Sequence, residues 1–347
     1  MQILYILIAI VLLGFIVTVH EFGHYLMGRL CGIGIVEFSI GFGPKLLGFK
    51  KKNIQYSLRL IPLGGYCAFL GEDNDHSAPN AMNNQPVWKR FLTVASGPAM
   101  NFVLAFLFCA ILLSCFITAE IFPLVSTVGE NTPAAECGLQ KGDIIVEIND
   151  TAISYDTAGV YAMQELIAEE ALTLTIDRDG ETAELQLVPE RIEDPASGAV
   201  DYQIGITLGS RTYTMGEALR GSCGYMVEFT GMMLESIKDL FFHGTGADEL
   251  MGPVGIVSFM SDTVERDALY GAVNLIFVLS LNVGIMNLLP LPGLDGGRLI
   301  FLIIEAIRRK PIPPEKEGMV HGFGLLLLLA LIVFITYKDI IRLFTGG

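Results

Sequence analysis

The sequence has 347 residues, of which 52% are hydrophobic and only 17% are charged. Because soluble domains average about 25% charged residues, this composition indicates a membrane protein and excludes a disordered chain. The formal net charge of −15 argues against a nucleic-acid-binding protein, which would hold phosphates with clustered lysine and arginine side chains. The six cysteines form no CxxC pair, which excludes a zinc ribbon and a thioredoxin-type motif.

The negative charge is concentrated in one part of the chain. Between Glu120 and Ser210 there are 18 acidic and 3 basic residues, which accounts for the whole net charge of −15. The remaining residues are neutral in sum. A change of composition on this scale indicates a separate domain.

The first predicted element is the apolar segment Ile3–Val19, which contains no charged residue. A transmembrane helix needs about 17–25 mostly apolar residues, so this segment is just long enough. A signal peptide is not expected, because no basic residue precedes the segment and no small-x-small cleavage site follows it.

An HExxH motif, His20-Glu21-Phe22-Gly23-His24, follows directly. Residues i and i+4 lie on one face of a helix, so both imidazoles can bind one zinc ion. Glu21 would then lie beside the metal, where its carboxylate can accept a proton from water. Ionisable groups at the end of a spanning helix are costly in lipid. The motif therefore predicts a metal site rather than two histidines that merely lie near the lipid headgroups.

The stretch after the motif predicts a β-hairpin at the membrane surface. Ile54–Ile61 alternates apolar and polar residues at first, which is the period of a half-buried strand. We expect Pro62–Gly65 to form the turn and Tyr66–Leu70 to return as the partner strand.

A second apolar segment, Phe91–Thr118, predicts another span, and the acidic block after it predicts a small αβ domain. In that block we expect strands at Asp143–Asn149, Leu172–Ile176 and Ala183–Val188 and a helix at Ala158–Ala168. Beyond it, Met215–Phe242 predicts an amphipathic helix on or beside the membrane.

The third apolar segment, Ala268–Leu289, ends in a polar, proline-rich sequence, Asn287-Leu-Leu-Pro-Leu-Pro-Gly-Leu-Asp295-Gly-Gly. Two prolines remove helical hydrogen bonds, and irregular backbone at membrane depth is tolerated only where it is buried in protein or lines a wet cavity. Asp295 is therefore the best candidate for the third ligand of a zinc site. The other histidines are expected to be solvated or interfacial: His76, His243 and His321.

The fourth apolar segment is Gly322–Tyr337, and four spans give a consistent topology. Basic residues are frequent in the loops between spans one and two and between spans three and four. The positive-inside rule places both loops in the cytoplasm, so the termini and the acidic block lie outside.

The combination of HExxH in the first span with N-x-x-P-x-P-x-L-D-G in a later one resembles the site-2 protease family of intramembrane zinc metalloproteases. The similarity is to the bacterial branch typified by the regulator of sigma-E protease. Further matching motifs are Gly41–Pro44, Pro62–Tyr66, Ser96–Pro98 with Asn101, Gly252–Val254 and Lys338–Ile340. The resemblance implies an α-helical polytopic membrane protein with four transmembrane helices, a membrane-associated β-hairpin and an inserted extracytoplasmic α/β PDZ domain.

The resemblance also implies roles for individual residues. It implies that His20, His24 and Asp295 bind Zn2+ and that Glu21 is the general base. It assigns Asn287, Pro290 and Pro292 to shaping the site and handling substrate, and it suggests that the hairpin, with Gly64 and Gly65, pairs with an extended substrate. Thr132–Ala135 and Gly138–Asp143 look like the PDZ segment that forms the peptide-carboxylate loop.

The implied organisation has four parts: 1–118 and 268–347 as the two halves of the protease core, 119–210 as the PDZ domain and 211–267 as an amphipathic linker. The implied substrates are single-span membrane proteins already trimmed by a site-1 protease, such as anti-sigma factors or remnant signal peptides. The implied location is the bacterial plasma (inner) membrane, with the active site toward the cytoplasm, lipid around the spans and no nucleic-acid partner. Two alternatives are a non-catalytic membrane PDZ scaffold and a metal transporter.

Overall fold

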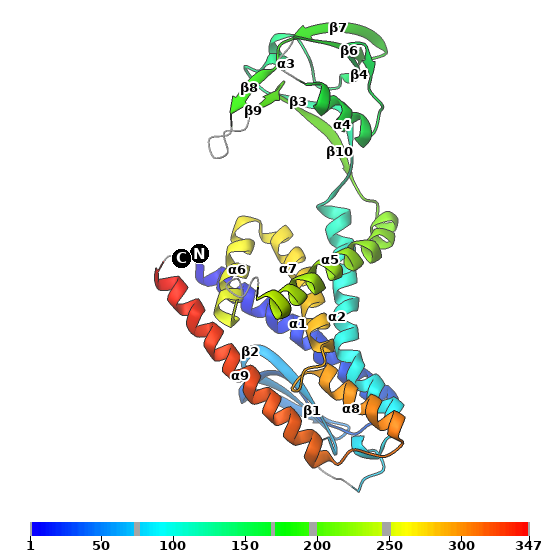
Figure 1. The fold of residues 1–347 in the computed structure, drawn as a ribbon, viewed down its shortest axis with the longest axis vertical. Helices are drawn as coiled ribbons and strands as arrows, with labels where there is room; N and C mark the ends of the chain where they lie inside the picture. Colours follow the sequence, from blue (N-terminus) through cyan, green and yellow to red (C-terminus); the bar gives the residue numbers. More distant parts are fainter. Residues whose placement is uncertain (1, 73–76, 168–170, 194–199, 245–250, 346–347) are drawn as a thin grey trace. The chain divides into compact units, whose positions relative to one another are not determined.

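The computed structural model describes residues 2–72, 77–167, 171–193, 200–244 and 251–345 (Figure 1). The chain forms two compact units, which are described separately. Unit 1 comprises Met1–Leu112 and Ala218–Gly347, and unit 2 comprises Leu113–Glu217. The described residues include four helices that are long and apolar enough to cross a membrane, in agreement with the sequence.

These four helices are α1 (Gln2–Cys31), α2 (Val87–Cys115), α7 (Ala268–Leu288) and α9 (Pro314–Thr345). Helix α1 continues well beyond the predicted apolar segment and carries the HExxH motif within it. It ends before Gly32, whose φ of 75° is the left-handed conformation that glycine commonly supplies at helix ends. The second predicted segment was too long, because Thr118 begins a strand of unit 2.

Three further helices complete unit 1: α5 (Met215–His243), α6 (Pro253–Arg266) and α8 (Asp295–Arg308). Helix α5 confirms the predicted helix, and its Tyr225 and Phe229 pack against Phe277 of α7. Helix α6 was not predicted. Its amino end is capped by a distant residue, because the buried Asp339 of α9 accepts a hydrogen bond of 2.8 Å from the Gly255 N–H.

A β-hairpin is present, but it is not the predicted one. Strand β2 (Ile54–Phe69) runs through the expected turn, and its partner is β1 (Ile35–Lys51), which was not predicted. The two strands turn at Lys52 and Asn53, both with positive φ. Residues 37–40 of β1 lie between the two halves of β2 and pair with both, so those halves do not pair with each other.

The pairing of β1 with β2 is irregular around Gly41, where glycine allows close backbone approach. Gly41 has a φ of 86°, and a Cβ there would lie 2.8 Å from the Ile61 carbonyl oxygen. Arg59 crosses the sheet to Glu37 at 2.9 Å. Burial alone would raise the pKa of Glu37, but hydrogen bonds with Ser57, Arg59 and Tyr66 lower it overall. Helix α1 packs along both strands.

The core beneath this sheet joins five helices and strands and a short 3₁₀ helix. Apolar side chains of α1, β1, β2, α2 and α8 form one buried cluster, which also contains Met82 of the short 3₁₀ helix Met82–Asn84. Its members include Ile35, Phe69, Val94 and Leu302. Packing of this kind holds the start of α8 against α1.

Unit 2 contains a six-stranded antiparallel sheet in the order β10-β3-β4-β6-β7, with β5 paired to β4. The strands are β3 (Thr118–Val128), β4 (Ile144–Ile148), β5 (Thr151–Ala152), β6 (Leu172–Arg178), β7 (Glu181–Leu187) and β10 (Ile206–Thr212). A separate pair is formed by β8 (Glu190–Glu193) and β9 (Val200–Gln203), and the helices are α3 (Pro133–Glu136) and α4 (Thr157–Leu166).

The predicted elements of the acidic block are present in unit 2, except that Ala168 lies outside the described residues. Asn149-Asp150 and Asp179-Gly180 have positive φ and form the tight turns that their sequences favour. Strands β3 and β10 were not predicted. The core consists of apolar side chains from the sheet and α4, including Ile145, Leu174, Ile176 and Met163.

The loop Gly138–Asp143 differs from the expectation that it receives a peptide carboxylate. Its backbone N–H groups, apart from that of Lys141, donate within unit 2; for example, the Gly142 N–H donates to the Val125 carbonyl at 2.8 Å. The buried Asp143 accepts from Arg178 at 2.7 Å, and these hydrogen bonds lower the pKa of the carboxyl. Five of the six backbone N–H groups of this loop are therefore engaged within unit 2.

Candidate metal centre

The two histidines of the HExxH motif lie one turn apart on α1 and face the same side. Both are buried, and their ring centroids are 4.9 Å apart in an edge-to-face arrangement. Small residues let α2 approach this face. A Cβ on Gly23 would lie 2.2 Å from the Ser96 carbonyl oxygen, and a Cβ on Gly97 would lie 2.2 Å from His24 Nε2.

Asp295 reaches the same point from the first residue of α8. Helix α7 ends at Leu288, and the proline-containing segment after it returns the chain so that α8 starts beside α1. Gly293 has a φ of 96°, and Cβ atoms on Gly296 or Gly297 would lie 2.1 to 2.5 Å from backbone carbonyl oxygens of this segment. The glycines therefore permit the tight return that places the carboxylate.

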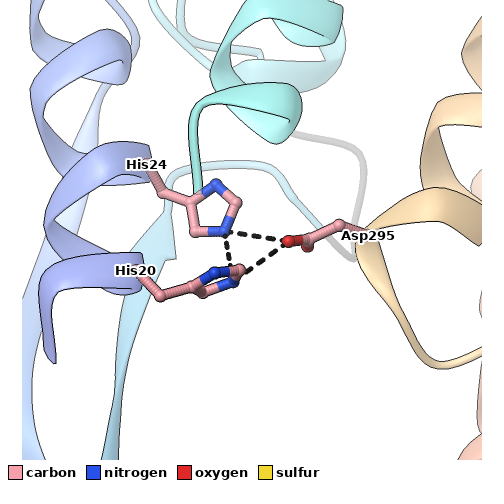
Figure 2. A group of neighbouring side chains, drawn as sticks. All are labelled: His20, His24 and Asp295. Carbon is pink, nitrogen blue, oxygen red and sulfur yellow. Dashed lines mark hydrogen bonds and ion pairs between the residues drawn. The ribbon is translucent and has the colours of Figure 1, made fainter. Parts of the chain in front are cut away.

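Three ligand atoms converge at the site. Oδ2 of Asp295 lies 3.1 Å from His20 Nε2 and 3.3 Å from His24 Nε2, and the two Nε2 atoms are 3.3 Å apart. Figure 2 shows the imidazoles of α1 pointing at the carboxylate. Within the described residues, these three side chains form the one group of metal-ligating type whose ligand atoms lie this close together.

This arrangement fits zinc. With bonds of about 2.0–2.1 Å, neighbouring nitrogen and oxygen ligands of a tetrahedral zinc ion lie about 3.3 Å apart. The three separations match this value. In addition, the buried Asp295 Oδ2 lacks a conventional hydrogen-bond partner in the described part of the chain, as a metal ligand would. Three protein ligands leave the fourth position of a catalytic site open.

The second nitrogen of each ring has a different partner. His24 Nδ1 lies 2.9 Å from the Thr93 carbonyl oxygen of α2, to which it donates. His20 Nδ1 lies 3.2 Å from the side-chain amide of Asn101, also on α2. Such contacts orient metal-binding imidazoles.

Glu21 lies beside the ligands in a cavity of about 290 Å³. The cavity is lined by all three candidate ligands and by Asn287, together with Cys67 of β2. A Cβ on Gly65 would lie 3.7 Å from Glu21 Cγ, so β2 approaches the carboxylate closely. The arrangement places an acidic group next to a metal site in a small polar cavity, which is what base-assisted hydrolysis requires.

The structure brings together some of the predicted site residues and not others. His20, Glu21, His24, Asn287 and Asp295 line one cavity. Gly65 lies against Glu21 from outside that lining. Pro290, Pro292 and Gly64 do not line it: the prolines lie in the segment between α7 and α8, and Gly64 packs against the Phe42 ring.

His321 was expected to be solvated or interfacial, and in the structure its side chain makes defined contacts with two other elements. Its ring packs on Phe301 of α8, and its Nδ1 accepts a hydrogen bond of 3.0 Å from the Gly293 N–H. His321 therefore joins α9 to the segment that precedes Asp295. A histidine at the start of an apolar run gives no sequence signal for this contact. Of the other two histidines, His243 pairs with Asp239 on exposed α5, and His76 lies outside the described residues.

A second cavity, of about 490 Å³, lies next to the first and shares Glu72, Met82, Val94 and Arg298 with it. Arg298 and Glu72 form an ion pair in the shared wall. Arg90 and Glu305 form another between α2 and α8. These two ion pairs were not predicted as parts of the site.

Comparison with known proteins gives consistent matches. The sequence profile described as peptidase family M50 matches residues 8–331. A protein of Agrobacterium fabrum that is named as a zinc metalloprotease is 34% identical, with 97% of this chain and 95% of that protein covered. The regulator of sigma-W protease RasP of Bacillus subtilis is 30% identical over 96% of this chain and 98% of its own length. Metalloprotease MmpA of Caulobacter vibrioides is 31% identical, with 96% of each covered.

Proposed function

The chain belongs to peptidase family M50 and is a zinc metalloprotease of the membrane, and from this premise we propose that it cleaves single-span membrane proteins within the bilayer. One observation carries the proposal. His20 and His24 lie inside α1, within a helix that is long and apolar enough to span a membrane. A site on such a helix suits a substrate that is itself embedded in lipid.

We assign His20, His24 and Asp295 as the zinc ligands and Glu21 as the general base. When bound, zinc would supply a Lewis acid that polarises the peptide carbonyl and makes water easier to deprotonate. Glu21 would take the proton of the attacking water and deliver it to the leaving amine. The buried position of the ligands limits the access of bulk water, which strengthens electrostatic interactions in the site.

The substrate is proposed to bind as a strand beside β2. A transmembrane helix satisfies its own amides, so it must unwind before cleavage, and a sheet edge would satisfy the released groups. In support, residues 65–69 of β2 pair only with β1 among the described strands, and Gly65 lies beside Glu21. We assign Gly64 and Gly65 to this edge.

Three residues near the end of α7 are proposed to handle the substrate around the scissile bond. Asn287 lines the cavity with Glu21 and the ligands, which supports a role for it in binding a substrate backbone group. Pro290 and Pro292 keep the following segment out of helical conformation, which lets Asp295 reach the site.

We propose that the basic loops face the cytoplasm and that unit 2 lies outside a bacterial plasma membrane. Residues 119–210 would then form an extracytoplasmic PDZ domain, and 211–267 a membrane-associated linker. The sheet and helices of unit 2 support an αβ domain of this size. The name of the B. subtilis relative refers to a sigma factor, which favours a pre-trimmed anti-sigma factor as substrate over a remnant signal peptide.

The test uses the full chain in liposomes with a single-span substrate that has a short external tail. Glu21→Gln should lower cleavage by about 10²–10⁴-fold while zinc stays bound. Asp295→Ala should lose both zinc and cleavage. Cleavage by the Glu21→Gln variant would contradict the mechanism, whereas cleavage of only the soluble tail by wild type would contradict the intramembrane site of action.

A further inference from the structure

The buried side chain of Asn101 contacts the proposed zinc ligand His20 without being a ligand itself. Asn101 is fully buried on α2, next to Gly284 of α7. Its Nδ2 lies 3.2 Å from His20 Nδ1, and its Oδ1 has no hydrogen-bond partner in the described residues. The amide thus uses one of its two polar ends, and that end faces the imidazole of a proposed ligand.

His24 shows by contrast what a zinc ligand needs. Its Nδ1 faces the Thr93 carbonyl oxygen, which can only accept, so Nδ1 carries the proton and Nε2 keeps its lone pair. An imidazole that binds metal through Nε2 must have its proton on Nδ1, and that proton needs an acceptor. For His20, the group in the acceptor position is the amide of Asn101.

In the structure as it stands, the Asn101 amide donates to His20. Nδ2 donates to Nδ1, so the proton of the His20 ring is on Nε2, which lies 3.1 Å from Asp295 Oδ2. In this tautomer the protonated Nε2 faces Asp295 and has no lone pair to offer a metal. The ring therefore cannot bind zinc through Nε2.

We propose that Asn101 is a positioning residue that fixes the tautomer of His20 by rotating its amide. A half-turn about the last side-chain bond exchanges Oδ1 and Nδ2, so that Oδ1 accepts from Nδ1–H and leaves the Nε2 lone pair to zinc. The rotation replaces one unpaired end of the amide by the other, so no hydrogen bond is lost. An asparagine can therefore present either an acceptor or a donor to the His20 ring.

The inference rests on the proposed ligands and not on the proposed substrate. The test measures zinc affinity of the purified full chain by competition with a chelator. Asn101→Leu, which has similar volume and no acceptor, should weaken zinc binding about 10–100-fold. Asn101→Asp keeps an acceptor and should bind zinc at least about 10-fold more tightly than the leucine variant.

Two controls separate the possible failures. Ser280→Ala changes another fully buried polar side chain that does not line the site cavity, and it should leave zinc affinity unchanged. His20→Ala should abolish tight binding; if it does not, the ligand assignment is wrong rather than the role of Asn101. Thermal unfolding in chelator shows whether each variant is folded.

Zinc affinity of Asn101→Leu equal to that of wild type would overturn the proposal. Equal losses in the leucine and aspartate variants, both folded, would also overturn it, because they would show that Asn101 acts only by packing. Nitrogen NMR of histidine-labelled wild type needs no variant at position 101. It should show His20 protonated at Nδ1 with zinc and at Nε2 without it, and an unchanged tautomer would contradict the amide rotation.

Discussion

Replacing Gly97 by alanine tests whether the spacing between α1 and α2 sets the geometry of the metal site. An added Cβ at position 97 would lie 2.2 Å from His24 Nε2, 2.4 Å from Cε1 and 2.9 Å from Cδ2. The contact therefore falls on the atom that is proposed to bind zinc. The His24 ring is held from the other side, because its Nδ1 donates to the Thr93 carbonyl at 2.9 Å.

The size of the effect follows from these distances. Ordinary van der Waals contact begins at 3.4 Å, so the ring or α2 must move by about 1.2 Å. Zinc ligands tolerate deviations of only about 0.2 Å. Overpacking of this kind costs about 1–3 kcal/mol. If that cost falls on the metal-bound state, zinc affinity drops by about 5- to 150-fold.

The assay compares zinc dissociation constants and thermal unfolding of purified Gly97→Ala with those of Gly231→Ala. Gly231 lies on helix α5, where nothing lies within 4 Å of an added Cβ, so this control changes the same chemical group without the contact. Alanine at that position should stabilise the helix by up to about 1 kcal/mol and leave zinc binding unchanged. Equal zinc affinity in the two variants would show that the close approach of α2 to His24 at Gly97 does not set the geometry of the metal site.

Three further predictions concern contacts outside the ligand set. Arg178 lowers the pKa of Asp143, so the pair stabilises unit 2 above the ordinary carboxyl pKa and loses this effect as the pH falls through the lowered pKa. Arg178→Ala should therefore destabilise unit 2 at pH 7, seen as faster hydrogen exchange in β4 and β6 of the full chain, and unchanged exchange would contradict this. His321→Phe removes the acceptor for the Gly293 N–H and should lower kcat about 2- to 10-fold with zinc retained. His321→Asn keeps an acceptor and should have a kcat close to that of wild type. Equal kcat in the two variants would show that this hydrogen bond does not support activity. Asp339→Leu should destabilise the capped end of α6 by about 1–3 kcal/mol, measured as a lower unfolding temperature, and Asp339→Asn should lose less.

The sequence was least informative about contacts between distant residues. The hairpin was assigned to the two halves of β2 because alternation indicates strands but not their partners. In the structure β1 pairs with both halves, and Gly41, with its positive φ, lies where the register is irregular. Helix α6 was not predicted, and the residue that caps its amino end, Asp339, lies far along the chain. The contact between His321 and Gly293 likewise depends on where α9 packs.

The sequence by itself determined the four spans and the pairing of His20, Glu21 and His24, because apolar length and helical periodicity act over a few turns of one helix. It also marked Asp295 as the candidate third ligand, since two prolines and a carboxylate after a spanning segment need a special environment. Only the tertiary structure decided that the three ligand atoms lie 3.1 to 3.3 Å apart and that Gly97 and Asn101 of α2 contact the imidazoles. Those distances depend on how α1, α2 and α8 pack, which no local pattern encodes.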